Sequence, residues 1–409
     1  MKLIHTADWH LGRALYGRKR YDEQSAFLDW LLATLSAEHA DALIIAGDIF
    51  DSGNPPNRAQ ALYYDFLCRA AATTCRHIII TAGNHDSPTF LDAPRELLRA
   101  LNIHIIGSAG SPADETLLLR APDGSVEAIC CAVPYLRERD IRSVDAGEST
   151  DDKARKLLEG IRTHYAATIA HAETLRATHG ADIPLIATGH LFAAGGSTTD
   201  GDGTRDLYIG SLAHVPTDAF PPAIIDYLAL GHLHRPQTVG GDPTRRYSGA
   251  PLAFGFGEAG QEKSLTCVTF AGRRPHIDTL AIPCWQTLAR IHGDWPTIEN
   301  RLHDLAASTA PVWLEIEYDG AEHIADLRER LQQRTEGTLL DILRIKNNRI
   351  TARVLAQDHA AERLDDLDPN DVFSRCLDAH NIPAAQRPDL YAAYRQILTD
   401  IREADNNAE

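Results

Sequence analysis

Aspartate, asparagine and histidine side chains gather in five short clusters within the first 234 residues. The clusters are Asp8-Trp9-His10, Gly47-Asp48, Gly83-Asn84-His85-Asp86, Gly189-His190 and Gly231-His232-Leu233-His234. Carboxylates, amides and imidazoles bind divalent cations, and imidazole also transfers protons near neutral pH. In an extended segment, residues two apart point to the same side, so each D-x-H or H-x-H pair can direct two side chains at one point. These residue types could support metal-assisted or acid–base chemistry, provided that the fold brings the clusters together.

Each cluster alone has a simpler interpretation. A D-x-H or H-x-H pair is a common feature of surfaces and cores, Gly47-Asp48 is a common turn, and Asn84-His85-Asp86 could form an Asx turn. A lone His190 would more often be a hydrogen-bonded histidine of the core. The joint occurrence of all five clusters in this order, each after an apolar run, is not expected by chance. Together they indicate one shared site.

The apolar runs before the clusters predict the elements that position them. The runs occupy residues 3–4, 42–46, 77–80, 183–187 and 227–230. Short aliphatic runs bounded by glycine are typical of strands buried on both faces. Between the first two runs, residues 24–37 repeat apolar side chains every three or four positions, which predicts a helix. The alternation predicts an α/β fold with covered sheets, in which ligands lie at the carboxyl ends of the strands.

The character of the chain changes after residue 284. We predict a first domain over residues 1–284, a small α+β domain over 285–355 and a helical segment over 356–409. The α+β domain has expected strands at 286–291, 312–318 and 339–345 and expected helices at 297–305 and 322–334. The helical segment carries apolar side chains at helical spacing, among them Phe373, Leu377, Leu390, Tyr394, Ile397 and Ile401. These side chains either bind helices of a partner or pack on their own domain.

Composition and charge exclude several classes of protein. The 409 residues are 44% hydrophobic and 24% charged, and no apolar run approaches the roughly 18–20 residues of a membrane span. Seven cysteines without a CxxC pair indicate free thiols in a reducing compartment, and we expect the cytoplasm. The net charge of −17 argues against coating nucleic acid through a general positive field. Any contact with DNA would need a local basic patch, bound cations or a partner.

The clusters and their neighbours resemble the calcineurin-like metallophosphoesterase superfamily. Within it, they resemble the SbcD family, the bacterial branch of the double-strand-break repair nucleases. The segments that carry the resemblance are 5–12 (HTADWHLG), 46–53 (AGDIFDSG) and 231–234 (GHLH). The resemblance implies a four-layer metallophosphoesterase sandwich, a small α+β capping domain and a C-terminal helical segment that binds a partner.

The resemblance also implies a pair of divalent cations, usually manganese in this family. The first cation would be held by Asp8, His10, Asp48 and His234, and the second by Asp48, Asn84, His190 and His232. Asp48 would bridge the two cations. Nitrogen and oxygen donors without thiolate suit manganese or iron better than a structural zinc.

The same resemblance implies roles for three further residues. His85 would act on the transition state or protonate the leaving 3′-oxygen without binding a cation. Asp51 would hold the second nitrogen of that imidazole. Asp86 would serve either as a turn cap or as a support for the ligands.

The partners that the resemblance implies are DNA and an SbcC-like coiled-coil ATPase, with two copies of this chain forming a homodimer within a two-plus-two heterotetramer. The family pattern is ATP-dependent 3′→5′ exonuclease activity on double-stranded ends. It is accompanied by endonuclease activity on single strands and hairpins, in DNA repair, recombination and replication. Candidate DNA contacts are Arg13, Arg18, Lys19, Arg20, Arg137, Arg139 and Arg142, which could equally form a solvated basic face.

Two other functions fit the same residues. One is a stand-alone calcineurin-like phosphatase or phosphodiesterase that acts on a small substrate, since phosphatases and nucleases share this metal core. The other is a non-catalytic scaffold for the ATPase. A small-molecule hydrolase would not need a capping domain and a helical tail, and a scaffold would not need the complete ligand set.

Overall fold

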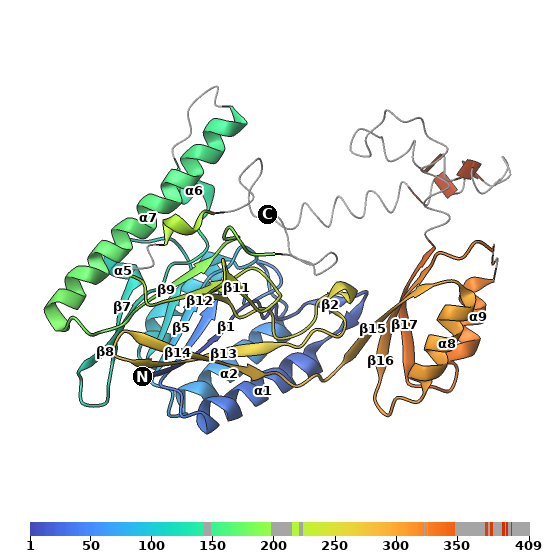
Figure 1. Ribbon diagram of the computed structural model, residues 1–409, viewed down its shortest axis with the longest axis horizontal. Helices are drawn as coiled ribbons and strands as arrows, with labels where there is room; N and C mark the ends of the chain where they lie inside the picture. The colour runs from blue at the N-terminus through green and yellow to red at the C-terminus, as the bar shows by residue number, and fades with distance from the viewer. Residues whose placement is uncertain are drawn as a thin grey trace. The chain divides into compact units, whose positions relative to one another are not determined.

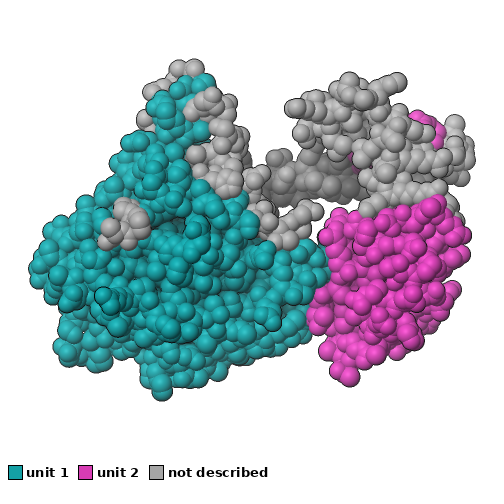
Figure 2. Space-filling view, in the orientation of Figure 1, with its two compact units in different colours: residues 1–286 teal, residues 287–409 magenta. Residues whose placement is uncertain are grey.

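The computed structural model describes residues 1–142, 149–197, 215–220, 224–322, 324 and 326–347, together with single or paired residues between 373 and 394. The chain forms two compact units, Met1–Gln286 and Thr287–Glu409 (Figure 2). The division falls close to the expected boundary after residue 284. Among the described residues, no helix has the length and apolar character that a membrane crossing requires.

The first unit contains two six-stranded sheets (Figure 1). In spatial order, the first sheet consists of β14 (Arg274–Ala281), β13 (Ser264–Ala271), β1 (Lys2–Thr6), β4 (Ala42–Ala46), β5 (His77–Thr81) and β6 (Ile103–Ile106). Strands β1, β4, β5 and β6 are parallel, β13 pairs antiparallel with β1, and β14 pairs antiparallel with β13. The parallel strands therefore carry their carboxyl ends to one edge of the sheet.

The second sheet repeats this arrangement. In spatial order, it consists of β11 (Gln237–Val239), β12 (Asp242–Tyr247), β10 (Tyr227–Gly231), β9 (Leu185–His190), β8 (Val126–Cys131) and β7 (Thr116–Arg120). Strands β8, β9, β10 and β12 are parallel, whereas β7 and β11 are antiparallel to their neighbours. The central strands β4, β5, β9 and β10 are buried along their whole length, because both faces of each sheet are covered.

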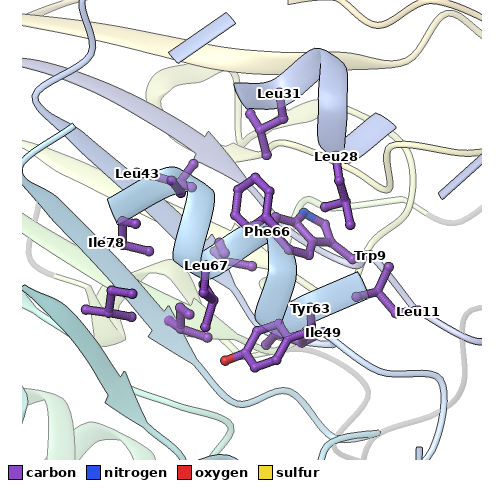
Figure 3. Close-up of a cluster of buried hydrophobic side chains, with 14 of the residues drawn as sticks. Trp9, Leu11, Leu28, Leu31, Leu43, Ile49, Tyr63, Phe66, Leu67 and Ile78 are labelled. Atoms are coloured by element: carbon purple, nitrogen blue, oxygen red, sulfur yellow. The ribbon is translucent and has the colours of Figure 1, made fainter. Parts of the chain in front are cut away.

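Three hydrophobic clusters separate four layers. Helices α1 (Tyr21–Ala37) and α2 (Asn57–Ala71) pack on the outer face of the first sheet, around Trp9 and Phe66 (Figure 3). A second cluster, which includes Ile44 and Ala229, lies between the sheets. Helix α7 (Thr150–His179) packs on the outer face of the second sheet. The prediction of an α/β fold with covered sheets is confirmed, and the helix expected at 24–37 begins three residues earlier, at Tyr21.

Short elements connect these layers. They are β2 (Ala14–Leu15), β3 (Arg18–Lys19), α3 (Pro88–Asp92), α4 (Arg95–Arg99), α5 (Pro112–Glu115), α6 (Glu138–Ile141) and the 3-10 helices η1 (Thr217–Ala219) and η2 (Phe256–Glu258). The β2–β3 hairpin directly follows the first cluster of polar residues.

The second unit contains a parallel three-stranded sheet of β15 (Thr287–Gly293), β16 (Val312–Tyr318) and β17 (Leu340–Asn347). Helices α8 (Trp295–Ala306) and α9 (Leu327–Thr335) pack on it through a separate apolar cluster. Asp294 caps α8 by accepting from the Thr297 amide at 3.0 Å, and Pro296 occupies its first turn. The strands and helices occur in the expected order, but the parallel sheet with a helix between successive strands is an α/β arrangement and not the expected α+β one, and α9 begins at Leu327, five residues after the expected start. Most of the predicted segment 356–409 lies outside the described residues.

Candidate metal centre

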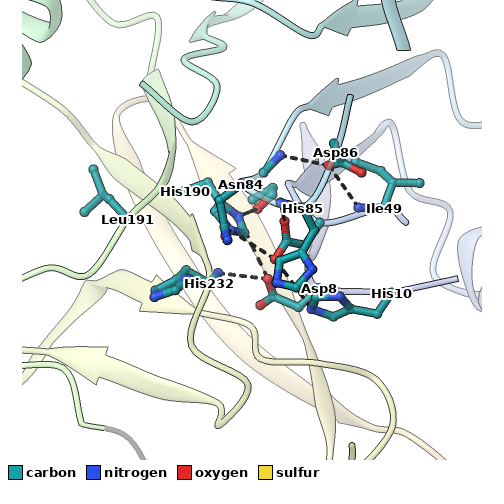
Figure 4. A network of polar contacts seen from close by, with 12 residues as sticks. Asp8, His10, Ile49, Asn84, His85, Asp86, His190, Leu191 and His232 are labelled. Atoms are coloured by element: carbon teal, nitrogen blue, oxygen red, sulfur yellow. Dashed lines mark hydrogen bonds and ion pairs between the residues drawn. The ribbon is translucent and has the colours of Figure 1, made fainter. Parts of the chain in front are cut away.

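The five polar clusters meet where the two sheets bring their strand ends together (Figure 4). Asp8 and His10 follow β1, Asp48 follows β4, and Asn84 and His85 follow β5 of the first sheet. His190 ends β9, and His232 and His234 follow β10 of the second sheet. Except for the half-buried Asn84 and His85, these side chains are at most 3% exposed. The prediction that the clusters share one site therefore agrees with the structure.

Asp48 lies at the centre of the cluster. Its Oδ2 is 3.5 Å from His10 Nε2 and 3.3 Å from His190 Nε2. Its Oδ1 accepts the backbone N–H of His85 at 2.9 Å. One carboxylate thus faces an imidazole from each sheet, as a bridging ligand must.

The remaining donors surround this carboxylate. Asp8 Oδ1 accepts the His232 N–H at 2.8 Å and lies 3.9 Å from His190 Nδ1. His10 Nε2 and His234 Nε2 are 3.3 Å apart, and His190 Nε2 is 3.0 Å from Asn84 Oδ1. The structure brings all seven predicted ligands into one connected set.

The chemistry of this set fits divalent cations. Within the described residues, buried Asp8 Oδ2 has no hydrogen-bond partner. Asp8, His10 and Asp48 each offer a donor atom within 4.8 Å of the others. A buried carboxylate oxygen without a partner costs free energy that a bound cation offsets. The donors are oxygen and nitrogen without thiolate, which favours manganese or iron over structural zinc.

The pKa shifts within the cluster also favour the binding of cations. Burial lowers the pKa of His190, but the charges of Asp48 and Asp8 outweigh it and raise this pKa to about 9. Burial, opposed by the charge of His190, raises the pKa of Asp8 to about 7. Burial also acts on Asp48, yet its histidine neighbours hold the pKa of that carboxyl well below the usual range. A cation bound by His190 must displace a proton, so its affinity decreases as the pH falls below about 9.

The backbone of the ligand loops is left-handed at four ligands. The φ angles are 54° at Asp8, 43° at His10, 52° at Asp48 and 101° at His232. Residues other than glycine rarely adopt this region, and strain of this kind gathers at functional sites. The extended segment expected around Asp8 and His10 is therefore wrong. A sharply turned chain, and not the alternation of a strand, directs both side chains inward.

Gly83 lies against the central carboxylate. A Cβ at Gly83 would be 2.1 Å from Asp48 Oδ1 and 2.3 Å from Asp48 N. The second contact is with backbone, so it cannot be relieved by a rotamer change. The glycine is therefore required for the close approach of the two loops.

Gly83→Ala is expected to weaken Mn²⁺ binding by about 10–100-fold, because the new methyl group must displace Asp48. Titration of the purified variant with Mn²⁺ measures the effect. The matched control is Gly53→Ala, whose Cβ would meet only Ser87 atoms and a backbone oxygen at ordinary distances of 3.7–4.0 Å. Equal Mn²⁺ affinity in the two variants would contradict this explanation of Gly83.

His85 is held beside the cluster by Asp51, but not in the expected way. His85 Nδ1 donates to the backbone carbonyl of Asp51 at 2.8 Å. The Asp51 carboxylate instead lies 3.5 Å from His10 Nδ1 and 3.5 Å from Arg13 Nη1. The contact to His85 is thus independent of the side chain at position 51, and the expectation of a carboxylate–imidazole pair is corrected. Nε2 is left as the His85 atom that can exchange a proton with a substrate.

Asp86 supports the loops around the cluster. Its buried carboxylate accepts backbone N–H groups from Gly83 at 2.8 Å, Phe50 at 3.0 Å and Ile49 at 3.2 Å. Burial and the nearby charge of Asp48 raise the pKa of Asp86 to about 6, against these hydrogen bonds. Asp86 therefore ties the loop after β5 to the loop after β4, a role wider than a turn cap.

The predicted DNA contacts have different environments. Arg18 and Lys19 are exposed on β3, and the Arg139 side chain is 74% exposed. Arg13 lies in the site, paired with Asp51, and Arg137 donates to the Asp86 carbonyl at 3.0 Å.

Two of the basic residues are structural. The Arg20 side chain is 2% exposed and is bound to Glu23 and to the Ala253 carbonyl. Arg142 is 6% exposed in its side chain and is paired with Glu138 at 3.2 Å. Their burial and ion pairs argue against a contact with DNA, which charge patterns in a sequence could not reveal.

Part of the predicted partner-binding set makes contacts within the chain. Phe373 stacks on Tyr394 with ring centroids 4.0 Å apart, and it meets Tyr391 edge-on at 5.5 Å. Leu377 is 5% exposed and Leu390 is 38% exposed. Ile397 and Ile401 lie outside the described residues.

Phe254 borders the cluster although the sequence did not predict it there. Its ring packs edge-on against His10 at 5.1 Å and against His234 at 5.4 Å, and Arg13 lies over it at 4.8 Å. An isolated phenylalanine in a loop carries no spacing signal, so only the fold reveals its position.

The comparison with family models identifies the class of protein. The calcineurin-like phosphoesterase family matches residues 1–236, and the type 5 capsule protein repressor C-terminal domain matches residues 284–381. The first match covers more than half of the chain and contains all seven candidate ligands. The chain therefore belongs to the calcineurin-like phosphoesterases, and it is a metal-dependent enzyme of that class.

Similar proteins with established names show to which branch of the calcineurin-like phosphoesterases the chain belongs. The chain is 37% identical to the D subunit of nuclease SbcCD from Escherichia coli (strain K12) over 97% of this chain and 98% of the relative. The proteins of the same name from Rhodobacter capsulatus and Bacillus subtilis (strain 168) are 39% and 38% identical, each over 66% of this chain and over 67% and 66% of their own lengths. Within its class, the chain belongs to the SbcD family. A crystal structure of a Thermus thermophilus protein aligns over 69% of this chain and 99% of its own, with a TM-score of 0.37 and 13% identity.

Proposed function

We propose that this chain is the nuclease subunit of an SbcCD-like complex and hydrolyses DNA phosphodiesters with two divalent cations, with Mn²⁺ as the physiological ion. The observation that carries the proposal is the position of Asp48, whose carboxylate faces His10 and His190 from opposite sheets at 3.5 and 3.3 Å. Membership of the SbcD family supports the substrate class, since the relatives are named as nuclease subunits.

The proposed ligand sets follow the two sides of Asp48. Asp8, His10 and His234 would complete the first set, and Asn84, His190 and His232 the second. When bound, a pair of cations stabilises the attacking and leaving oxygens of a phosphodiester in an in-line displacement. The protein holds the donors in place by hydrogen bonds between the loops: the Asp8 amide donates to Gly47 O and the His10 amide to Asp48 O, both at 3.0 Å.

His85 is the proposed proton donor to the leaving 3′-oxygen. Its Nδ1 donates to the Asp51 carbonyl, so Nε2 is the nitrogen left to exchange a proton, and it can donate one when the ring carries hydrogens on both nitrogens. Its ring lies edge-on to His10 with centroids 4.7 Å apart, which keeps it next to the ligands. Proton transfer by a positioned side chain contributes about 10²–10⁴-fold to rate.

The finer features of the proposal come from the family. We propose ATP-dependent 3′→5′ exonuclease activity on double-stranded ends, and endonuclease activity on single strands and hairpins, in DNA repair, recombination and replication. The partner would be an SbcC-like ATPase bound through residues 356–409, in a two-plus-two heterotetramer, with residues 285–355 as a capping domain. Free thiols at all six described cysteines support a reducing location such as the cytoplasm.

One assay separates the proposed function from its alternatives. The purified chain, with and without its coiled-coil ATPase, is given linear duplex DNA, Mn²⁺ and ATP, in parallel with bis-p-nitrophenyl phosphate. Cleavage of DNA that increases with the ATPase and ATP is the expected result. Hydrolysis of the small phosphodiester without DNA cleavage would favour a stand-alone phosphodiesterase. Mn²⁺ binding without any hydrolysis would favour a scaffold.

The exposed pair Arg18 and Lys19 is proposed to contact the DNA backbone. Replacing both with alanine is expected to weaken DNA binding uniformly across sequences and to reduce the slope of log affinity against log salt by about 2. Fluorescence anisotropy between 50 and 200 mM salt, roughly the range in which such slopes are resolved, measures it. The contrasting variant is Arg20→Ala, which should lower the free energy of unfolding by about 3 kcal/mol because it leaves Glu23 without its ion pair. An unchanged salt slope in the double variant would remove these two residues from the interface.

A further inference from the structure

A buried ion pair lies behind the candidate metal centre. Lys263 is 7% exposed and Glu258 is 1% exposed, and the Lys263 ammonium is bound to the Glu258 carboxylate. Lys263 immediately precedes β13, and Glu258 ends η2. Burying two charges is costly unless each has further polar partners, so the contacts of this pair indicate what it holds.

The lysine holds the backbone of a ligand. Lys263 Nζ donates to the carbonyl of His234 at 3.1 Å. The same carbonyl accepts the Ala250 amide at 3.0 Å, and a Cβ at Gly249 would lie 2.7 Å from it. The His234 carbonyl is therefore fixed by two hydrogen bonds, with Gly249 leaving the room that they need, and the two imidazole Nε2 atoms of His234 and His10 are 3.3 Å apart.

The glutamate holds the aromatic ring that borders two ligands. Glu258 Oε2 accepts the Phe254 amide at 2.7 Å. The Phe254 ring packs edge-on against both His10 and His234. Arg20 binds the carbonyl of Ala253, so both polar groups of the Ala253–Phe254 peptide are hydrogen-bonded.

We propose that the Glu258–Lys263 pair is a positioning device that sets the orientation of His234 directly and of His10 through Phe254. The inference rests on the proposed metal centre and deepens it. His10 and His234 would bind the same cation, and the Glu258–Lys263 pair would orient these two ligands without belonging to the ligand set. The pair touches no substrate. Its effect is on how firmly that cation is held, since groups that orient a metal-binding histidine typically change metal affinity by about 10–100-fold.

The test uses a variant that removes both charges together. Glu258→Gln keeps an acceptor for the Phe254 amide, and Lys263→Met keeps the length of the side chain while removing the donor to His234. Replacing a buried ion pair with neutral groups of similar volume is often neutral for stability, so the double variant E258Q/K263M should unfold near the wild-type denaturant concentration. We expect Mn²⁺ titration, followed by the electron paramagnetic resonance signal of free Mn²⁺, to show one of two ions bound about 10–100-fold more weakly.

The matched control is a pair outside the ligand cluster, formed by a buried glutamate and a partly buried histidine. Glu115 is fully buried, and His164 Nε2 lies 2.8 Å from its Oε2. E115Q/H164Q should leave Mn²⁺ affinity unchanged, whatever it does to stability. Wild-type Mn²⁺ affinity in the folded E258Q/K263M variant overturns the proposal.

Phe254→Leu provides an independent test should that double variant fail to fold. It removes the ring from His10 and His234 without changing a charge, and it is expected to weaken the same ion. Wild-type affinity in this variant would then overturn the inference. Failure of the proposed metal centre, on which the inference rests, has a different signature, namely a wild-type protein that itself binds no Mn²⁺.

Discussion

Asp48→Asn is expected to reduce DNA hydrolysis by at least about a thousandfold, equivalent to about 4 kcal/mol of transition-state stabilisation. The reason is the central position of this carboxylate between His10 and His190. Asparagine keeps the shape and can still accept the His85 amide through its oxygen, but it removes the negative charge that two cations would share. The measurement is the rate of release of nucleotides from linear duplex DNA at saturating Mn²⁺.

A second measurement on the same variant separates loss of metal from loss of fold. Mn²⁺ at roughly 100 times its dissociation constant should stabilise the wild-type protein by about 2.7 kcal/mol, which raises the melting temperature. That rise should be greatly reduced in Asp48→Asn and retained in Asp29→Asn, where the replaced carboxylate is 54% exposed and paired with Arg69. Wild-type cleavage by Asp48→Asn would exclude the bridging role.

His85→Ala is expected to lower DNA cleavage by about 10²–10⁴-fold while both cations remain bound. The imidazole is oriented through Nδ1 by a backbone carbonyl and belongs to neither proposed ligand set. Its removal should therefore change the chemical step and leave Mn²⁺ affinity near that of the wild type. Single-turnover cleavage at several Mn²⁺ concentrations tests both statements.

Asp51→Asn is the informative comparison for His85. Its carboxylate faces His10 and Arg13, so its replacement should weaken Mn²⁺ binding, and added Mn²⁺ should restore cleavage. Added Mn²⁺ should not restore cleavage in His85→Ala. If added Mn²⁺ has the same effect on both variants, the Asp51 carboxylate does not support the metal ligands separately from His85, and the assigned roles are contradicted.

The fold and the ligand cluster were accessible from the sequence because their signals are local. Runs such as 42–46 are apolar at every position since β4 is covered on both faces, and the polar residues that follow must then lie at the strand end. Parallel pairing of β1 with β4 and of β9 with β10 brings those ends together. Spacing and order along the chain were enough for this step.

The contacts within the cluster depend on information that no local pattern carries. The sequence indicates neither the left-handed turn at Asp48 nor the choice between the carbonyl and the carboxylate of Asp51 as the partner of His85. Arg20 resembles its exposed neighbours in type, and only the packing of the 253–258 turn against it shows that it is buried. Phe254, Glu258 and Lys263 reach the cluster from a loop distant in sequence, so their roles emerge only when the sheets are assembled.

The origin of the ligands in both sheets has a consequence for the lifetime of the protein. Asp8, His10, Asp48 and Asn84 come from one layer, whereas His190, His232 and His234 come from the other. Ligation across the two layers would cross-link them. Depletion of the cation would then reduce the stability of the association between the two sheets, in addition to stopping catalysis. Proteases that attack transiently opened chains would then remove the inactive form first, and turnover in the cell would follow the supply of the ion.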